Sequence, residues 1–234
     1  MIGQTVSFFL PTRKGSERVL NKNTRPFAGI EGGLVENKIR QLLSARLIDE
    51  IVFSSNDELS ISVAEKFKYD SRLKIIERPS ELCLSSTNLQ DLISYVPTVT
   101  QADHILWGHV TTPFADADVY DSAIKAYEEN LQCGYDSLVG VTELRNFLLN
   151  KDGELINNTT DIPWPRTQDL EPIYEINHTV FLASRRIYRE QKNRLGHKPF
   201  LHVMDSVHSL DIDWPEDFTI AEAVYRRLYA ERPE

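Results

Sequence analysis

The sequence is poor in cysteine, with only Cys83 and Cys133 among its 234 residues. The two cysteines have no metal-ligand spacing and cannot supply a framework of disulfides. We therefore expect free, partly buried thiols in a reducing compartment, and a cytoplasmic protein. The sequence also lacks a charged N-terminal segment followed by a long apolar run, and no apolar run approaches the roughly 18 residues of a membrane span. These absences argue against a signal peptide and a membrane-spanning segment.

Positive charge is also in deficit, because the formal net charge at pH 7 is −9. Proteins that bind nucleic acid or anionic membranes need a basic surface, so this balance argues against both partners. The glycine motif of P-loops, G-x-x-x-x-G-K-[ST], and that of dinucleotide-binding folds, G-x-G-x-x-G, are absent. The length is sufficient for one large α/β domain with a sizeable core.

Apolar and amphipathic segments alternate over much of the chain. Short apolar runs predict strands, and apolar residues at helical spacing predict helices. The expected strands are 6–10, 48–54, 73–77, 105–107, 137–141 and 179–183, and the expected helices are 34–45, 58–67, 89–99, 116–130, 185–192 and 215–228. The alternation predicts an α/β fold with a mainly parallel sheet and helices on both faces. Ligands bind such sheets beyond the carboxyl ends of the strands.

A basic loop follows the first expected strand. Arg13, Lys14, Arg18 and Lys22 supply four cations, and Gly15 permits close approach of the backbone to a ligand. Cationic side chains and backbone N–H groups together can bind phosphate oxygens. From the pattern alone, a phosphate-binding loop and a solvated basic loop are equally open interpretations.

A pair of carboxylates near the C-terminus forms a second candidate site. Asp211 and Asp213 alternate with apolar Leu210 and Ile212, so a strand here would place both carboxylates on one face. Neighbouring carboxylates repel one another unless a cation relieves them, and Mg²⁺ prefers a few carboxylate and phosphate oxygens as ligands. The alternative is that one aspartate caps the helix that begins at Pro215.

These two stretches resemble the acylneuraminate cytidylyltransferases, also called CMP-sialic acid synthetases. The family pattern R-x-G-S-K-x-[ILV]-x-x-K-N is matched at Arg13, Gly15, Ser16, Val19, Lys22 and Asn23, whereas Glu17 stands where the family usually has lysine. The family pattern D-I-D-[TS]-P-E-D is matched from Asp211 onward, with Trp214 in place of the small hydroxyl residue. The resemblance implies nucleotide binding by Arg13, Gly15, Ser16, Arg18, Lys22 and Asn23, Mg²⁺ binding by Asp211 and Asp213, and catalysis by Arg13, Lys22, Asp211 and Asp213.

A third stretch resembles the family segment that lies against the pyrimidine. It has the form R-P-x-x-L followed by a hydroxyl-rich loop, and it adds the nucleotide-binding candidates Arg78, Ser85, Thr87 and Asn88. Without the resemblance, a surface turn would explain this stretch. His109 occupies the place of glutamine in the family's Q-P-T-S-P, where the side chain contacts nucleotide and sugar. The alternative for His109 is an ordinary buried histidine.

The α/β pattern breaks at a segment rich in Asn, Asp, Pro and Thr, which carries a predicted hairpin turn with Asp152-Gly153 at its tip. The resemblance implies that residues 143–176 project from a single domain, 1–234, and form contacts across a homodimer. It also implies sugar binding by His109, Arg145, Arg166 and Asn177. Arg166 would reach the site of the partner subunit, and Arg145 is the cation nearest to the family's expected sugar-site lysine.

The resemblance implies a Rossmann-like nucleotidyltransferase fold with a mixed, mostly parallel sheet. It also implies a Mg²⁺-dependent reaction in which CTP and an acidic 2-keto sugar give a CMP-sugar and pyrophosphate. Two alternatives remain open at this point. The chain could activate a different acidic sugar such as Kdo, or it could be a homologue that binds nucleotide without catalysis.

Overall fold

The first strand, β1 (Val6–Pro11), lies inside the sheet between β2 and β4, and its side chains alternate between two hydrophobic clusters. Phe8 packs edge-to-face on Tyr120 with 4.9 Å between ring centroids, and Phe9 packs likewise on Trp107 at 5.0 Å. A strand buried on both faces reads as a continuous apolar run, as this one does. The computed structural model describes residues 4–15 and 18–229.

Seven strands form one mixed sheet in the order β3-β2-β1-β4-β6-β5-β7. Every neighbouring pair is parallel except the two pairs that include β6, which runs antiparallel to both β4 and β5. The predicted mostly parallel, mixed sheet is therefore confirmed. The remaining strands are β2 (Glu50–Ser55), β3 (Leu73–Glu77), β4 (His104–Trp107), β5 (Ser137–Leu144), β6 (Ile173–Ser184) and β7 (Pro199–Val203).

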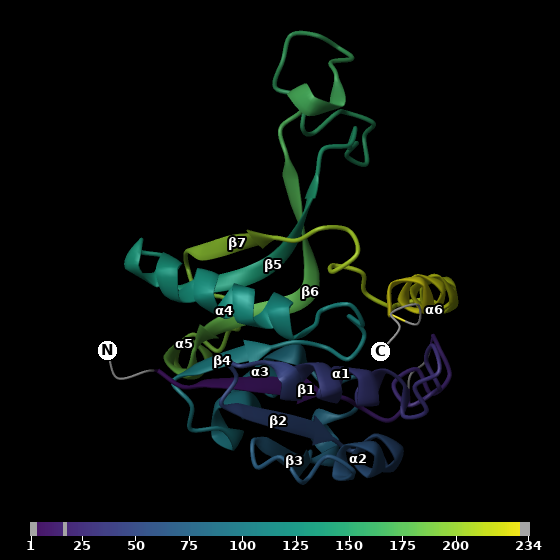
Figure 1. Ribbon diagram of the computed structural model, residues 1–234. Helices are drawn as coiled ribbons and strands as arrows, with labels where there is room; N and C mark the ends of the chain where they lie inside the picture. Colours follow the sequence, from purple (N-terminus) through teal and green to yellow (C-terminus); the bar gives the residue numbers. More distant parts are fainter. Residues whose placement is uncertain (1–3, 16–17, 230–234) are drawn as a thin grey trace.

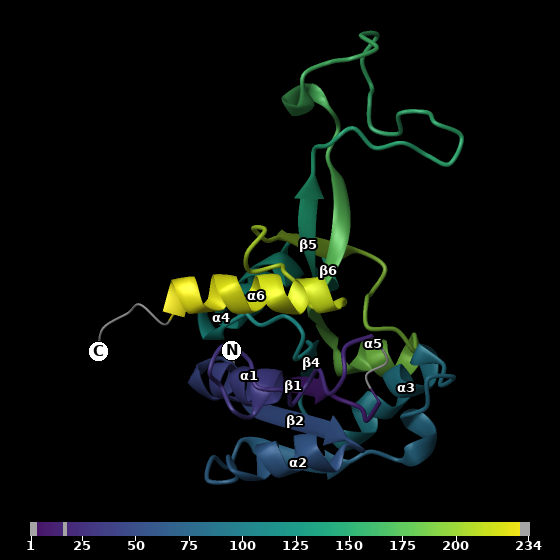
Figure 2. The same cartoon turned by 90° about the vertical axis from the view of Figure 1, so that its right-hand side faces the viewer.

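Helices cover both faces of the sheet. Figure 2 shows α1, α4 and α6 on one side and α3 and α5 on the other. The helices are α1 (Gly33–Ser44), α2 (Glu58–Glu65), α3 (Leu89–Val99), α4 (Ala117–Gln132), α5 (Arg185–Glu190) and α6 (Pro215–Tyr229), with short 3-10 turns at Ser80–Leu82 and Thr167–Asp169. Side chains of Asp57, Asn88 and Asp116 accept hydrogen bonds from the first turns of α2, α3 and α4, which explains where those helices begin. None of the helices in the described part of the chain is both long and apolar enough to cross a membrane.

The segment between β5 and β6 stands away from the sheet as a long arm, here the residues 145–172 (Figure 1). An isolated bridge between Leu149 and Leu155 closes a small hairpin, and Gly153 at its tip has a φ of 84°. Only glycine adopts such a φ without strain. The predicted hairpin turn is therefore present.

Three expectations from the sequence were wrong in detail. The edge strand β7 was not predicted, and β6 begins at Ile173 rather than at residue 179. The third concerns Asp211 and Asp213, which lie in an irregular segment before α6 rather than in a strand. The backbone N–H of Ile212 bonds to the carbonyl of Thr111 in a loop, at 2.9 Å, instead of joining a sheet ladder.

A fully buried lysine fastens the loop after β4 to α1. The Lys38 side chain is 0% exposed, and its Nζ lies 2.9 Å from Thr112 O, 2.6 Å from Ala115 O and 2.9 Å from Tyr120 Oη. Burial lowers the pKa of Lys38 well below its ordinary value. Asn37 Nδ2 adds a bond to Pro113 O at 3.0 Å. The loop 111–115 is therefore held from beneath by one face of α1.

We expect Lys38→Met to lower the free energy of unfolding by about 2–4 kcal/mol, because two buried carbonyls lose their donor and each such loss costs about 1–3 kcal/mol. Urea unfolding of the purified variant measures the change. Arg40→Met is the matched control, since Arg40 lies on the exposed side of α1 in an ion pair with Glu36. An exposed pair contributes about 1 kcal/mol or less. Equal losses in the two variants would contradict the fastening role.

Candidate active site

A cavity of about 660 Å³ opens at the carboxyl ends of β1 and β4. Four stretches supply most of its lining, namely the loop after β1, the loop after β3, the loop after β4 and the segment before α6, and α3 and His178 of β6 complete it. The candidates that line it are Arg13, Arg18, Lys22, Asn23, Arg78, Ser85, Thr87, Asn88, His109, Asp211 and Asp213. The structure thus brings most of the predicted nucleotide-binding and catalytic residues to one place.

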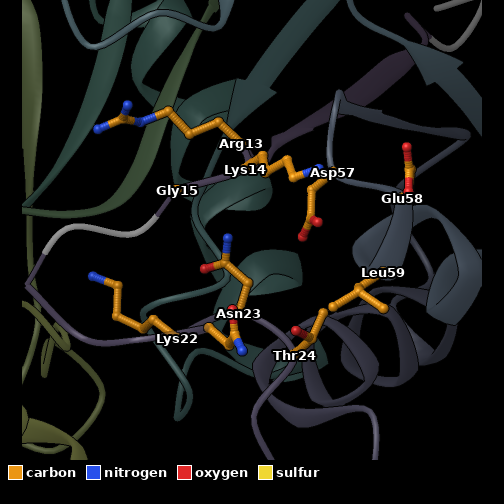
Figure 3. A pocket seen from close by; sticks show the side chains of 10 residues that line it. Arg13, Lys14, Gly15, Lys22, Asn23, Thr24, Asp57, Glu58 and Leu59 are labelled. Atoms are coloured by element: carbon orange, nitrogen blue, oxygen red, sulfur yellow. The ribbon is translucent and has the colours of Figure 1, made fainter.

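The loop after β1 also lines a smaller hollow of about 250 Å³, shown in Figure 3. Arg13, Lys22 and Asn23 border both spaces, while Gly15 borders only the smaller one. In Figure 3 the side chains of Arg13 and Lys22 extend on the same side of the loop, away from Glu58. Gly15 has a φ of 83° and open space where a Cβ would be, so its backbone is accessible to a ligand. Ser16 and Glu17, singled out from the sequence, lie outside the described residues.

The backbone of Ile212 connects the two candidate sites. Lys22 Nζ donates to Ile212 O at 2.7 Å and lies 3.8 Å from Asp213 Oδ1, while Ile212 N donates to Thr111 O. Ile212 itself is fully buried, so the aspartates on either side of it are directed to the cavity that both of them line. The alternation of apolar and acidic residues therefore produces the predicted pairing of carboxylates without a strand.

The two aspartates have different surroundings. Burial, and to a smaller extent the charge of Asp213, raises the pKa of Asp211, although a hydrogen bond to Thr111 opposes this. Asp211 Oδ1 is sealed from solvent and has no hydrogen-bond partner among the described residues. Asp213 is half exposed and pairs with Arg18 Nη2 at 3.1 Å, and the Arg18 guanidinium also lies 5.0 Å from the ring centroid of Trp214.

Helix capping is performed by a third aspartate. Asp217 Oδ2 accepts from the backbone N–H of Asp213 at 3.0 Å and from that of Trp214 at 2.7 Å. This contact occupies the start of α6 and leaves the side chains of Asp211 and Asp213 to the cavity. The donor set suits a hard cation such as Mg²⁺, because Asp211 carries an oxygen without a partner and Asp213 is a second carboxylate beside it. No group of three or more His, Cys, Asp or Glu side chains capable of holding a metal occurs within residues 4–15 and 18–229, so a bound ion would take further ligands from phosphates or water.

Arg78 lines the cavity, but most of its guanidinium is engaged by the protein. It is largely buried, Nη2 donates to Thr12 O at 2.5 Å and Nε donates to Cys83 Sγ at 3.1 Å, whereas Nη1 has no partner among the described residues. It therefore braces the loop after β3 against the loop after β1. Thr87 Oγ1 donates to Glu81 O at 2.7 Å, and Asn88 Oδ1 caps α3. These bonds shape the rim of the cavity. Contact of Arg78, Thr87 and Asn88 with a nucleotide base remains a prediction.

His109 lies at the far end of the cavity beside Trp107 and His178. Its ring centroid is 6.3 Å from each of theirs. Burial, followed by the charges of Arg194 and His178, lowers the pKa of His109 to about 3. The imidazole is therefore neutral near pH 7, where it can donate or accept a hydrogen bond but is a weak base.

Three predicted sugar-binding residues are not brought to either space within one chain. Arg145 and Arg166 lie in or beside the arm and pair with Glu143 at 2.6 Å and with Asp169 at 2.8 Å. Asn177 is buried on β6, where its Oδ1 accepts from Thr179 N at 3.2 Å. The cavity has wall residues that the sequence did not single out, namely Thr12, Trp107, Thr111 and His178. Thr12, Trp107 and Thr111 could have been suspected from the sequence only because they lie at the ends of strands. His178 lies at the irregularity between β5 and β6, which only the structure shows.

A family model described as cytidylyltransferase matches residues 8–232. The chain belongs to the cytidylyltransferase family. Family membership and the nucleotidyltransferase class expected from the sequence are therefore confirmed.

Two curated relatives resemble this chain over most of its length. It is 25% identical over 230 residues to N-acylneuraminate cytidylyltransferase of Escherichia coli O18:K1:H7, with 93% of this chain and 51% of the relative covered, so it spans about half of that protein. It is 26% identical over 224 residues to pseudaminic acid cytidylyltransferase of Campylobacter jejuni, with 93% and 94% covered. A solved CMP:2-keto-3-deoxy-manno-octonic acid synthetase, complexed with CTP, shares the fold with a TM-score of 0.65 at 11% identity, over 95% of this chain and 99% of the other.

The lowered pKa of His109 predicts a specific acid sensitivity. An unfolded histidine titrates near pH 6.5, so below that pH the unfolded chain binds a proton that folded His109 refuses. The free energy of unfolding therefore decreases as the pH drops below 6.5, by up to about 1.4 kcal/mol per pH unit for this one group. We expect His109→Gln to lose less stability than the wild type between pH 6 and pH 4 in urea unfolding. Identical slopes for both proteins would contradict the lowered pKa of His109.

Proposed function

We propose that this cytidylyltransferase transfers the cytidylyl group of CTP to an acidic 2-keto sugar of the sialic-acid kind. The observation that carries the proposal is that Lys22 contacts Ile212 O and Asp213, between and beside the two carboxylates, at the wall of one cavity. A triphosphate needs cations along its oxygens, and the carboxylate pair suits the metal ion that accompanies it. The names of the two relatives support a nonulosonic acid, an acidic nine-carbon sugar, as the acceptor.

In the proposed reaction, the anomeric hydroxyl oxygen of the sugar attacks the α-phosphorus of CTP. The bond from that phosphorus to the bridging oxygen breaks, pyrophosphate leaves, and the hydroxyl proton passes to solvent. Arg13 and Lys22 neutralise the charge that develops on the phosphate oxygens, which is where most catalysis of phosphoryl transfer arises. Mg²⁺ held by Asp211 and Asp213 would act as a Lewis acid on the α-phosphate. His109 offers a neutral hydrogen-bonding group at the end of the cavity, toward the sugar.

The arm supplies the proposed dimer contact. It exposes large apolar side chains, including Leu149, Ile156, Ile162 and Trp164, of which Trp164 is 73% exposed. Apolar side chains gathered on a projecting segment are typical of an interface. We propose that a second copy of this chain covers them and that Arg166 then approaches the partner subunit's cavity. The free thiols Cys83 and Cys133 are compatible with a reducing compartment, and we propose a cytoplasmic location.

Pyrophosphate release tests the proposed function. We expect release with CTP, Mg²⁺ and at least one acid among N-acetylneuraminic, pseudaminic, legionaminic and Kdo, and CTP should be preferred to UTP and ATP. Asp211→Asn and Asp213→Asn should each fold normally and lose about 10²-fold or more in turnover, the scale of one lost transition-state stabiliser. Asp205→Asn, an exposed aspartate outside the cavity, is the matched control. Binding of CTP without release for any acid would identify a non-catalytic homologue, and release only with Kdo would move the assignment to that sugar.

Light scattering tests the dimer. We expect the wild type to be dimeric at micromolar concentration and Trp164→Asp to raise the dimer dissociation constant by at least about tenfold, since an interfacial tryptophan often contributes 2 kcal/mol or more. Tyr69→Asp is the matched control, because Tyr69 is an aromatic residue of the domain body that is 80% exposed. A monomeric wild type with full activity would refute the proposal.

A further inference from the structure

The aromatic end of the cavity has a cation behind it that no carboxylate neutralises. Arg194 lies between α5 and β7, with its guanidinium carbon 3.6 Å from the ring centroid of Phe181 and 5.2 Å from that of Trp107. It forms no hydrogen bond or ion pair with any residue in the described part of the chain. Burial lowers the pKa of this guanidinium, with only Tyr188 acting in the opposite direction.

The loop that carries Arg194 is anchored in place. Asp136 Oδ2 accepts from His197 N at 2.7 Å, and its Oδ1 accepts from Lys198 N at 3.0 Å. Gly196 fits against the same carboxylate so closely that a Cβ would lie 2.2 Å from Asp136 Oδ1. The position of Arg194 is therefore set by the loop, and the guanidinium rests on two rings of the sheet.

Two polar atoms near Arg194 lack a hydrogen-bond partner. Trp107 Nε1 and Tyr188 Oη are both sealed from solvent and have no hydrogen-bond partner within residues 4–15 and 18–229. An indole N–H can only donate, and a buried cation or donor left unpaired is costly. The charge of Arg194 also reaches His109, whose pKa it lowers. Trp107 and His109 both line the cavity, so this donor-rich group lies against its wall.

The other candidate cations for the sugar are engaged elsewhere. Within one chain, Arg145 and Arg166 pair with carboxylates outside the cavity and Lys22 is bonded to Ile212 at the phosphate end, so none of the three lies at the end formed by Trp107 and His109. We propose that Arg194 is the specificity-determining cation for the sugar and that it attracts the sugar's carboxylate to the end of the cavity formed by Trp107 and His109. This inference rests on the proposed function. A carboxylate in the cavity supplies the negative charge that Arg194 lacks, and a cation behind a low-dielectric wall attracts it more strongly than one in water.

The test compares the acidic sugar that the wild type turns over with its methyl ester, which lacks the negative charge. We expect Arg194→Met to raise KM for the acid by at least about tenfold, to leave KM for CTP unchanged, and to leave kinetics with the ester close to those of the wild type. Arg194→Lys keeps the charge and should recover part of the affinity for the acid. Arg189→Met, an exposed arginine on α5, is the matched control and should change nothing.

Each result decides the matter. If Arg194→Met weakens acid and ester equally, or only lowers the melting temperature, Arg194 supports the rings and the inference is wrong while the proposed function stands. A rise in KM for CTP of the same size as that for the sugar would also overturn it. If the wild type releases no pyrophosphate with any acidic sugar, the proposed function fails and this inference fails with it.

Discussion

The backbone of Ile212, whose N–H and C=O each form a hydrogen bond, joins the distant parts of the site. Its N–H reaches the loop after β4 and its carbonyl receives the Lys22 ammonium. Lys22 and Ile212 are 190 residues apart in the sequence, yet this contact sets the carboxylates of Asp211 and Asp213 beside the basic loop. Ile212 is buried in the same cluster as β1, so the hydrophobic core and the site share one support. Lys38 in turn holds the loop after β4, which contains Thr111, the acceptor of the Ile212 N–H.

The sequence predicted well the half of the molecule that is built around β1 and the basic loop. β1 is a continuous apolar run before a basic loop, and helices such as α3 and α4 have strong amphipathic patterns with a capping side chain. The carboxylate pair was found by alternation, although the interpretation as a strand was wrong. Alternation reports which residues face the core, and a single buried residue such as Ile212 produces it in irregular backbone as well.

Features that depend on tertiary contacts escaped prediction. β7 is a short, half-exposed edge strand whose five residues form no clear pattern, and it exists because β5 offers a parallel partner. Arg78 has the motif of a base-contacting residue, but its guanidinium is used as a brace between two loops. Arg194 lies in a loop without periodicity, so only the packed structure shows that it meets Phe181 and Trp107. That it has no carboxylate partner within residues 4–15 and 18–229 is likewise visible only in three dimensions.

The antiparallel direction of β6 has a mechanical consequence. Because β6 runs against its neighbours, it starts at the edge where β4 and β5 end, so the arm leaves the sheet at the same edge as the cavity. The pairing of β5 and β6 is interrupted opposite Gly140, and His178 there has a φ of 59°. A Cβ at Gly140 would lie 2.8 Å from Asn177 Oδ1, so this joint admits no larger residue without a shift. The base of the arm thus carries His178, a wall residue of the cavity, so the arm and the cavity share one tightly packed joint of the sheet.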